Sequence, residues 1–290
     1  MIQQLSRQKI VLFAVFVAIL ILACASLGPG GDNSSDSAAT QAGSTDLPPQ
    51  ATPTLDMEAR IKAANVLVFE NTWGLDLALT QVVQSALDGM GMKNYTYTKS
   101  DNGVFMDALL TDTKYDLIIV DQENKKLTIT GDFWDRIYER LTNDDAALII
   151  EIWYLDQEAK GPISKILEGC GIRYQKDLPV DSSIYWWDSA HPIFNEPNVI
   201  PPLLHYGTYW KKQAGDRIRL AEGSDATLLA GLAQASSDEE AVLATCYGGR
   251  VIIQTFSDHD YSFVPHDVEV IGLWQNYIHY TLKNHFELTP

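Results

Sequence analysis

Positively charged side chains are scarce in this sequence of 290 residues. Its 21 Lys and Arg residues oppose 38 Asp and Glu residues, which leaves a formal net charge of −17. Such a surface repels a phosphate backbone, so we exclude nucleic acid as a partner. It also disfavours electrostatic docking on anionic lipid. The simplest role of the acidity is to keep a folded domain soluble, and we prefer that interpretation.

Cysteine is almost absent, with three residues, Cys24, Cys170 and Cys246. None of their spacings resembles a zinc site. Cys170 lies at the end of a predicted helix and Cys246 lies in a predicted strand. An exported protein could pair these two residues, but we expect two buried free thiols in place of a disulfide.

The sequence also lacks a clear set of metal ligands. Asp258, His259, Asp260 and His266 are close in sequence and belong to residue types that bind metals. The same types are common in loops between a strand and a helix, and Asp267 is suited to cap the last predicted helix. We therefore expect no metal, and we expect no cofactor.

Long apolar runs are missing except near the N-terminus. Residues 10–23, IVLFAVFVAILILA, have no polar side chain, and the preceding MIQQLSRQK carries two positive charges and no negative one. This pattern is typical of an export signal. An uncleaved signal anchor is the alternative, because residues 10–27 reach the lower length limit for a membrane span. The positive flank places the remainder of the chain outside the cytoplasm in both cases.

The residues Ile21-Leu22-Ala23-Cys24 resemble the lipobox of bacterial lipoproteins. The resemblance implies cleavage just before Cys24, a diacylglyceryl group on its sulfur and an acylated new N-terminus. Residues 1–23 would then be a signal peptide and Cys24 the lipidation site. Two or more acyl chains give stable anchoring, so we expect the cell membrane to be a partner through this lipid anchor.

A polar segment separates the anchor from the folded part. Residues 28–56, GPGGDNSSDSAATQAGSTDLPPQATPTLD, consist mostly of small, polar and proline residues, which cannot form a core. We interpret residues 24–56 as the lipidated cysteine and a disordered linker, whose flexible part spans roughly 30 Å. The sequence predicts one domain over residues 57–290.

Strand and helix patterns alternate along the first part of that domain. Apolar or alternating runs predict strands, and runs with helical spacing predict helices between them. Such alternation indicates a mostly parallel sheet with helices on both faces. The predicted strands are 65–70, 94–99, 115–121 and 146–154, and the predicted helices are 75–90, 104–110, 132–141 and 163–170.

The pattern changes in the second part. Residues 176–215 are rich in aromatic residues and proline and show little periodicity, which indicates an elaborated surface region. Three apolar runs follow at 226–232, 241–247 and 250–256, and Gly248-Gly249 predicts a hairpin between the last two. A final helix is predicted over about 267–285.

Several polar and aromatic residues fall where predicted strands end. Ligands of open parallel sheets bind outside the carboxyl ends of the strands, so these residues are candidates for a pocket that takes a polar ligand with an apolar face, such as a sugar. The alternative is that polar residues end strands because loops are solvated. The candidates are Glu70, Asn71, Trp73, Asp121, Glu151, Trp153, Tyr154, His259 and Asp260.

Two aromatic pairs in the irregular region, Trp186-Trp187 and Tyr209-Trp210, allow two interpretations. Their rings could stack on sugar rings as part of a binding site. They could equally pack the irregular region onto the sheet, and we favour packing because large aromatic side chains are usually mostly buried.

The element order, the motif AHPIF at 190–194 and the stretch GGRVIIQTFSDHDYS at 248–262 together resemble the class I glutamine amidotransferase-like superfamily, and within it the ThuA-like branch. The resemblance covers roughly residues 63–284 and implies a flavodoxin-like three-layer α/β sandwich. His259 matches the place of the family's catalytic histidine. The place of the catalytic cysteine, after residues 146–154, holds Trp153-Tyr154-Leu155-Asp156, with no thiol.

A histidine cannot act as the base of a Cys-His pair without the thiol. We therefore expect a surface-anchored lipoprotein with a degenerate, non-catalytic domain that binds a ligand or partner, such as a saccharide or an envelope protein. One alternative is a carbohydrate-processing hydrolase in which strand-end carboxylates work with His259 as acid and base. Another is a subunit of an envelope transport or motility assembly.

Overall fold

The computed structural model describes residues 56–71, 81–122, 132–179, 183–204, 215–258 and 267–289. The chain divides into two units, residues 1–52 and 53–290, and all the described residues belong to the second. The predicted signal segment and nearly all of the linker lie outside the described residues. So do four of the singled-out residues, Trp73, His259, Asp260 and His266, and the pair Tyr209-Trp210.

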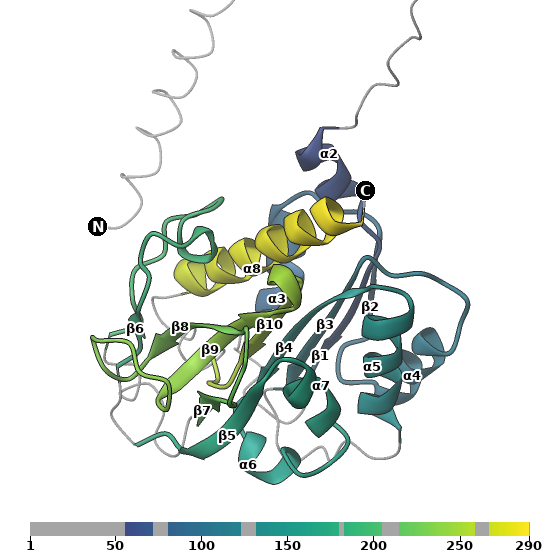
Figure 1. The fold of residues 1–290 in the computed structure, drawn as a ribbon. Helices are drawn as coiled ribbons and strands as arrows, with labels where there is room; N and C mark the ends of the chain where they lie inside the picture. Colours follow the sequence, from purple (N-terminus) through teal and green to yellow (C-terminus); the bar gives the residue numbers. More distant parts are fainter. Residues whose placement is uncertain are drawn as a thin grey trace, which may run out of the picture. The chain divides into compact units, whose positions relative to one another are not determined.

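Five parallel strands form the main part of a central sheet, in the spatial order β2-β1-β3-β4-β10 (Figure 1). In chain order this is the 2-1-3-4-5 arrangement of flavodoxin-like folds. The predicted fold class is therefore confirmed. The strands are β1 (Val66–Glu70), β2 (Tyr95–Tyr97), β3 (Leu117–Gln122), β4 (Ala147–Ile152) and β10 (Val251–Gln254).

Antiparallel strands extend the sheet beyond β10. β9 (Ala241–Cys246) pairs with β10 through a tight turn at Tyr247–Gly249, where Gly248 and Gly249 both have positive φ. Glycine takes this conformation without steric cost, which is why the predicted hairpin forms here. The remaining strands are β5 (Ile172–Asp177), β6 (Tyr185–Trp186), β7 (Asp216–Leu220) and β8 (Thr227–Gly231). Of these, β8 was predicted, whereas β5, β6 and β7 were not.

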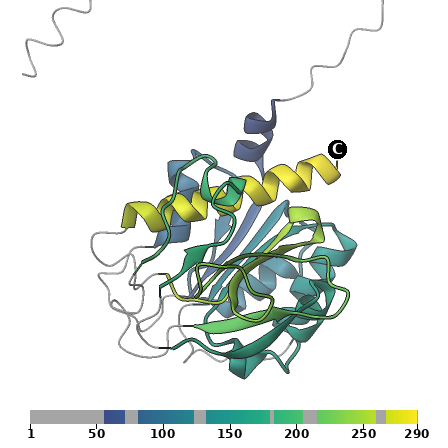
Figure 2. The same cartoon turned by 60° about the vertical axis from the view of Figure 1, so that its left-hand side comes forward.

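Helices cover the two faces of the parallel strands as separate layers (Figure 2). Alternation within the strands divides the core: Val66 and Val68 face one layer, and Leu67 and Phe69 face the other. The first layer holds α2 (Met57–Ala63), α3 (Val82–Gly89), the 3-10 turn η1 (Pro192–Phe194) and α8 (Asp267–Leu288). The second holds α4 (Asn102–Leu109), α5 (Phe133–Asn143), α6 (Leu155–Glu158) and α7 (Ser164–Gly169).

The long final helix α8 packs against the sheet and against α2, α3 and η1. Of the apolar stripe that the sequence predicts along this helix, Trp274, Ile278 and Leu282 are fully buried, whereas Val268 is 74% exposed. Helix α3 begins at Val82, whereas the predicted helix begins at residue 75; residues 75–80 lie outside the described part.

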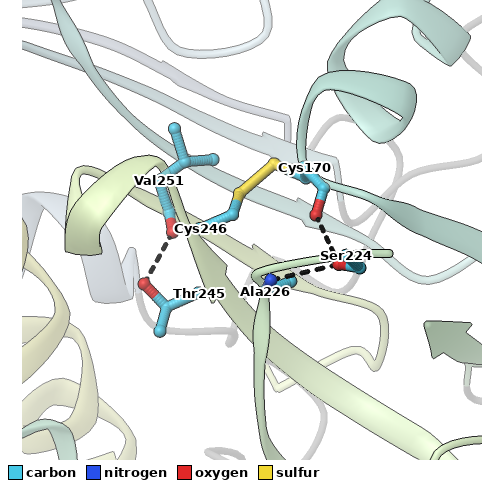
Figure 3. Close-up of a disulfide and its surroundings, with 6 residues drawn as sticks. All are labelled: Cys170, Ser224, Ala226, Thr245, Cys246 and Val251. Carbon is cyan, nitrogen blue, oxygen red and sulfur yellow. Dashed lines mark hydrogen bonds between the residues drawn. A yellow bond between two sulfur atoms is a disulfide. The ribbon is translucent and has the colours of Figure 1, made fainter. Parts of the chain in front are cut away.

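A disulfide joins Cys170 and Cys246, with their Cα atoms 5.3 Å apart (Figure 3). The expectation of two free thiols was therefore wrong. Cys170 follows α7 and Cys246 ends β9, and folding brings together these two places, which are 76 residues apart in the sequence. Both residues are buried, and Ser224 Oγ donates to the Cys170 carbonyl at 3.4 Å beside the bond.

No helix within the described ranges is long and apolar enough to cross a membrane.

Candidate functional site

Three carboxylates and one amide lie side by side where the parallel strands end. Glu70 of β1 is in register with Asp121 of β3, Asp121 with Glu151 of β4, and Glu151 with Gln254 of β10. Neighbouring strands are about 4.8 Å apart, so the four residues form a line across the sheet. We call Glu70, Asp121, Glu151 and Gln254 the polar row.

The polar row faces α3 and α8, because alternation along each strand puts its members on the side of Val68, Ile119, Ile149 and Ile252. All four side chains are 0% exposed. Burying charged groups is unfavourable unless they are hydrogen-bonded or paired, and like charges at this spacing repel each other. Such an unfavourable cluster therefore indicates a functional site, and the carboxyl ends of strands commonly bind ligands.

The side chain of Glu70 caps the N-terminus of α3. Its carboxylate accepts hydrogen bonds from the backbone N–H groups of Val83 at 3.1 Å and Gln84 at 3.3 Å, which are otherwise unpaired at a helix N-terminus. The hydroxyl of Tyr97, on β2, donates to the same carboxylate at 2.7 Å. Glu70 therefore connects β1, β2 and α3 in the described structure.

Helix α8 fixes the other end of the row through two aromatic side chains. Tyr277 donates its hydroxyl to Gln254 Oε1 at 2.7 Å, and Gln254 Nε2 donates to Asp258 Oδ2 at 2.9 Å. The indole of Trp274 donates to the same Asp258 oxygen at 2.8 Å. Asp258 directly precedes the candidate residue His259 in the sequence, so this network fixes the chain just before it.

Burial and the negative charge of the site raise the pKa of two tyrosines. Burial, followed by the charge and hydrogen bond of Glu70 and the charge of Asp121, raises the pKa of Tyr97. Burial, followed by the charges of Asp258 and Glu151, raises the pKa of Tyr277 well above its ordinary value. Both phenols therefore stay protonated and act as hydrogen-bond donors to the site.

A second polar group lies on the opposite face of the same strand ends. Gln122 Oε1 accepts hydrogen bonds from Asn71 Nδ2 at 2.8 Å and from the Tyr154 hydroxyl at 3.0 Å. Trp153 packs beside Tyr154, with their rings edge to face at 5.6 Å. The predicted candidates are thus divided between two faces: Glu70, Asp121 and Glu151 come together on one, and Asn71, Trp153 and Tyr154 on the other.

The turn after β4 differs from a nucleophile elbow. An elbow presents its nucleophile on a strained, exposed backbone between a strand and a helix. Here Trp153 and Tyr154 are 4% and 3% exposed, and Tyr154 has φ −118°. The thiols of Cys170 and Cys246 are both in the disulfide, which lies beside Val251, where β10 begins and not where it ends.

Trp186 lies three strands from Gln254, in register with it through Leu243 and Ala230. Trp186 is buried, stacks on Phe194 with ring centroids 4.3 Å apart and donates its indole N–H to the Ile200 carbonyl. Trp187 packs over Gly231, where an added Cβ would come within 2.0 Å of the indole ring. Both rings pack the irregular region onto the sheet, as the favoured interpretation predicted.

Four residues of the site were not among the predicted candidates: Tyr97, Gln254, Trp274 and Tyr277. The only signal for them in the sequence is the polar Gln254 inside the apolar run RVIIQTF. Within the described ranges, no group of three or more His, Cys, Asp or Glu side chains is arranged to hold a metal ion.

No known family model matches the chain, and no curated protein matches it. Among solved structures, it is similar to a GMP synthase-type protein from Thermoplasma acidophilum, with a TM-score of 0.45 and 12% identity over 78% of this chain and 97% of that one. It is also similar to a ThuA-like protein from Parabacteroides merdae, with a TM-score of 0.40 and 14% identity over 66% and 78% of the two chains. At these scores the fold class rests on the strand order described above.

Proposed function

We propose that this protein is a membrane-anchored lipoprotein whose amidotransferase-like domain binds a ligand or partner protein at the carboxyl ends of its parallel strands and has no glutaminase chemistry. The observation that supports the proposal most directly is that Cys170 and Cys246 form a disulfide. The turn that would present a nucleophile holds two buried aromatic rings, and the only cysteines of the domain are bonded to each other at the other end of β10.

The hydrogen bonds of the site support a binding role. Glu70 is occupied by the start of α3 and by Tyr97, and Asp258 is occupied by Trp274 and Gln254. Side chains held in this way fix the strand ends and the start of α3 as a rigid frame around which a ligand would bind. They are poorly placed to exchange protons during a reaction, because their oxygens already accept fixed hydrogen bonds.

The absence of glutaminase activity can be tested with the purified full chain. We expect no ammonia release from glutamine above the blank, and no change with His259→Ala. Thiol titration of the unfolded, unreduced chain is the companion measurement: the domain should contribute no free thiol. Ammonia release that disappears with His259→Ala would overturn the proposal.

Ligand binding at the polar row can be tested with Glu151→Gln, which keeps the shape of the side chain and removes its charge. The matched control is Glu168→Gln, an exposed glutamate at the end of α7. Binding to a saccharide panel, or recovery of a cross-linked envelope protein, should fall with Glu151→Gln and persist with the control. Equal binding by both variants would move the site elsewhere.

The proposed export of the chain is supported by the disulfide, since such bonds persist mainly in oxidising compartments outside the cytoplasm. The N-terminal peptide of the wild type tests the anchor. With a lipid on Cys24, the mature chain should begin at residue 24 and carry the mass of acyl chains. A mature chain that keeps residues 1–23 and carries no acyl mass would show that the apolar segment is an uncleaved anchor.

A carbohydrate-processing hydrolase is the second candidate, and the alignment of three carboxylates in one row favours it. Glycoside hydrolysis uses two carboxyl groups that flank one bond. Release of reducing sugar by the wild type, lost in both Asp121→Asn and Glu151→Gln, would establish this function. Sugar binding without release would leave the binding role.

A further inference from the structure

A separate cleft of about 300 Å³ lies between α2, the end of α3 and the middle of α8. It is near the point where the chain enters the domain, since α2 precedes the first residue of β1. The polar row lies at the last residue of that strand. Gln275 and His279 of α8 line the cleft, whereas Trp274 and Tyr277 of the same helix reach the polar row.

The wall of this cleft is held by a series of amide side chains. Buried Asn276 accepts a hydrogen bond from the backbone N–H of Asn198 at 2.9 Å and donates to the Asn198 carbonyl at 2.8 Å. Asn198 Nδ2 in turn donates to Gln275 Oε1 at 2.9 Å. Because its oxygen is used in this way, Gln275 presents Nε2, a hydrogen-bond donor, on its other side.

A glycine makes room for that donor. A Cβ added at Gly89, the last residue of α3, would lie 2.5 Å from Gln275 Nε2. Gly89 has an ordinary helical backbone conformation, so its lack of a side chain serves the approach of the amide and not an unusual φ angle.

One lysine at the cleft forms no ion pair within the described ranges. His279 Nε2 lies 2.8 Å from Glu58 Oε1, a contact that is an ion pair only when the imidazole is protonated. Lys62 lines the same cleft one helical turn after Glu58, and it has no ion-pair partner among the residues that the structure describes. Apolar surface comes from Met90, which is partly exposed, whereas Ile61 is 1% exposed and adds almost none.

We propose that this cleft is a second ligand site, which binds a small monocarboxylate with a short hydrocarbon part. The carboxylate accepts hydrogen bonds from Lys62 Nζ and Gln275 Nε2, and the hydrocarbon part packs on Met90. The volume lies at the lower end of the range for small-molecule sites, which limits the ligand to a short chain. A charged donor gives the stronger of the two hydrogen bonds.

The test uses the full chain with hexanoate as the probe, and hexylamine and hexanol as matched compounds, measured by calorimetry. Hexanoate should bind at least about tenfold more tightly than either compound, and Lys62→Met should weaken it about tenfold. Gln275→Glu, which replaces the donor by a carboxylate, should abolish binding. The control Lys160→Met removes an exposed lysine outside the cleft and should change nothing.

Gly89→Ala is a further variant, because it displaces the Gln275 amide without removing a polar group. It should weaken hexanoate binding while the thermal unfolding temperature stays near that of the wild type. Equal binding of all three probe compounds, or unchanged hexanoate binding in Lys62→Met, would overturn the proposal. So would the absence of any hexanoate binding by the wild type.

Discussion

The amino and carboxyl ends of the parallel strands carry different kinds of polar chemistry. Near the amino ends, a disulfide joins α7 to β9, and Asp116 before β3 pairs with His285 of α8. At the carboxyl ends, three buried carboxylates lie in one row. The first set ties elements together, whereas the second places three carboxylates side by side, of which Glu70 joins β1, β2 and α3 through its hydrogen bonds. We infer that the contacts at the amino ends mainly stabilise the fold, whereas the buried carboxylates at the carboxyl ends lower its stability in favour of a binding site.

Removing the disulfide should have the largest effect. The double variant Cys170→Ala/Cys246→Ala should lower the free energy of unfolding by about 2–4 kcal/mol, because a long loop is no longer closed in the unfolded chain. Urea denaturation measures this change. Reducing agent should lower the stability of the wild type to that of the variant and leave the variant unchanged. A wild type that is insensitive to reductant would contradict the assignment of stability to this end.

The pairing of Cys170 with Cys246 could not be predicted from the sequence. The alternation of strands and helices followed from apolar runs separated by helical patterns, because each run reports its own burial. Cys170 and Cys246 are 76 residues apart, and nothing local to either indicates the other. Strands β5 and β7 were missed for a related reason. Their sequences, IRYQKD and DRIRL, are interrupted by charges that reach solvent or pair with neighbours, as Arg217 does with Glu240.

Part of the candidate site could be predicted from the sequence, and part could not. The rule that ligands meet strand ends predicted Glu70, Asp121 and Glu151, because the first two end apolar runs and the third lies near the end of one. Their alignment in a single row depends on the register between strands, which is a property of the folded sheet. Tyr97 and Tyr277 come from β2 and α8 and reach the row only through tertiary packing, so no local pattern marks them.

Glu70→Ala should have the next largest effect, a loss of about 2 kcal/mol in the free energy of unfolding. The substitution leaves the backbone N–H groups of Val83 and Gln84 and the hydroxyl of Tyr97 without their acceptor. Exposed Glu168→Ala is the matched control and should change stability little. Chemical denaturation of both variants makes the comparison. A stabilised Glu70→Ala would mean that repulsion within the row outweighs the bonds of Glu70.

Alkaline pH should lower the stability that comes from the carboxyl ends of the parallel strands. The pKa of Tyr277 is raised in the fold, so the folded state keeps a proton that the unfolded state loses above about pH 10. This contribution is complete below pH 10 and is lost as pH rises, by about 1 kcal/mol at pH 11. Tyr277→Phe should show a smaller fall in stability between pH 9 and 11 than the wild type. Parallel pH profiles would show that this tyrosine is not coupled to the row.

Acid should weaken the amino end, with the smallest of these effects. Burial acts to raise the pKa of Asp116, but the hydrogen bonds from His285 and from the Asn65 backbone N–H, with the charges of His285 and Arg60, outweigh it and lower the pKa. The stability from this carboxylate is therefore present above about pH 4 and is lost as pH falls through the lowered value.

Because Asp116 is only half buried, we expect Asp116→Asn to flatten the acid part of the stability profile by less than about 1 kcal/mol. Asp107→Asn, on the exposed side of α4, is the control and should leave the slope unchanged. Urea denaturation at a series of pH values from neutral to acid gives the slope for each variant. The two ends would then lose stability in opposite pH ranges, each through the groups that distinguish it. A wild-type slope retained in Asp116→Asn would assign the acid sensitivity to the polar row and remove this contrast between the ends.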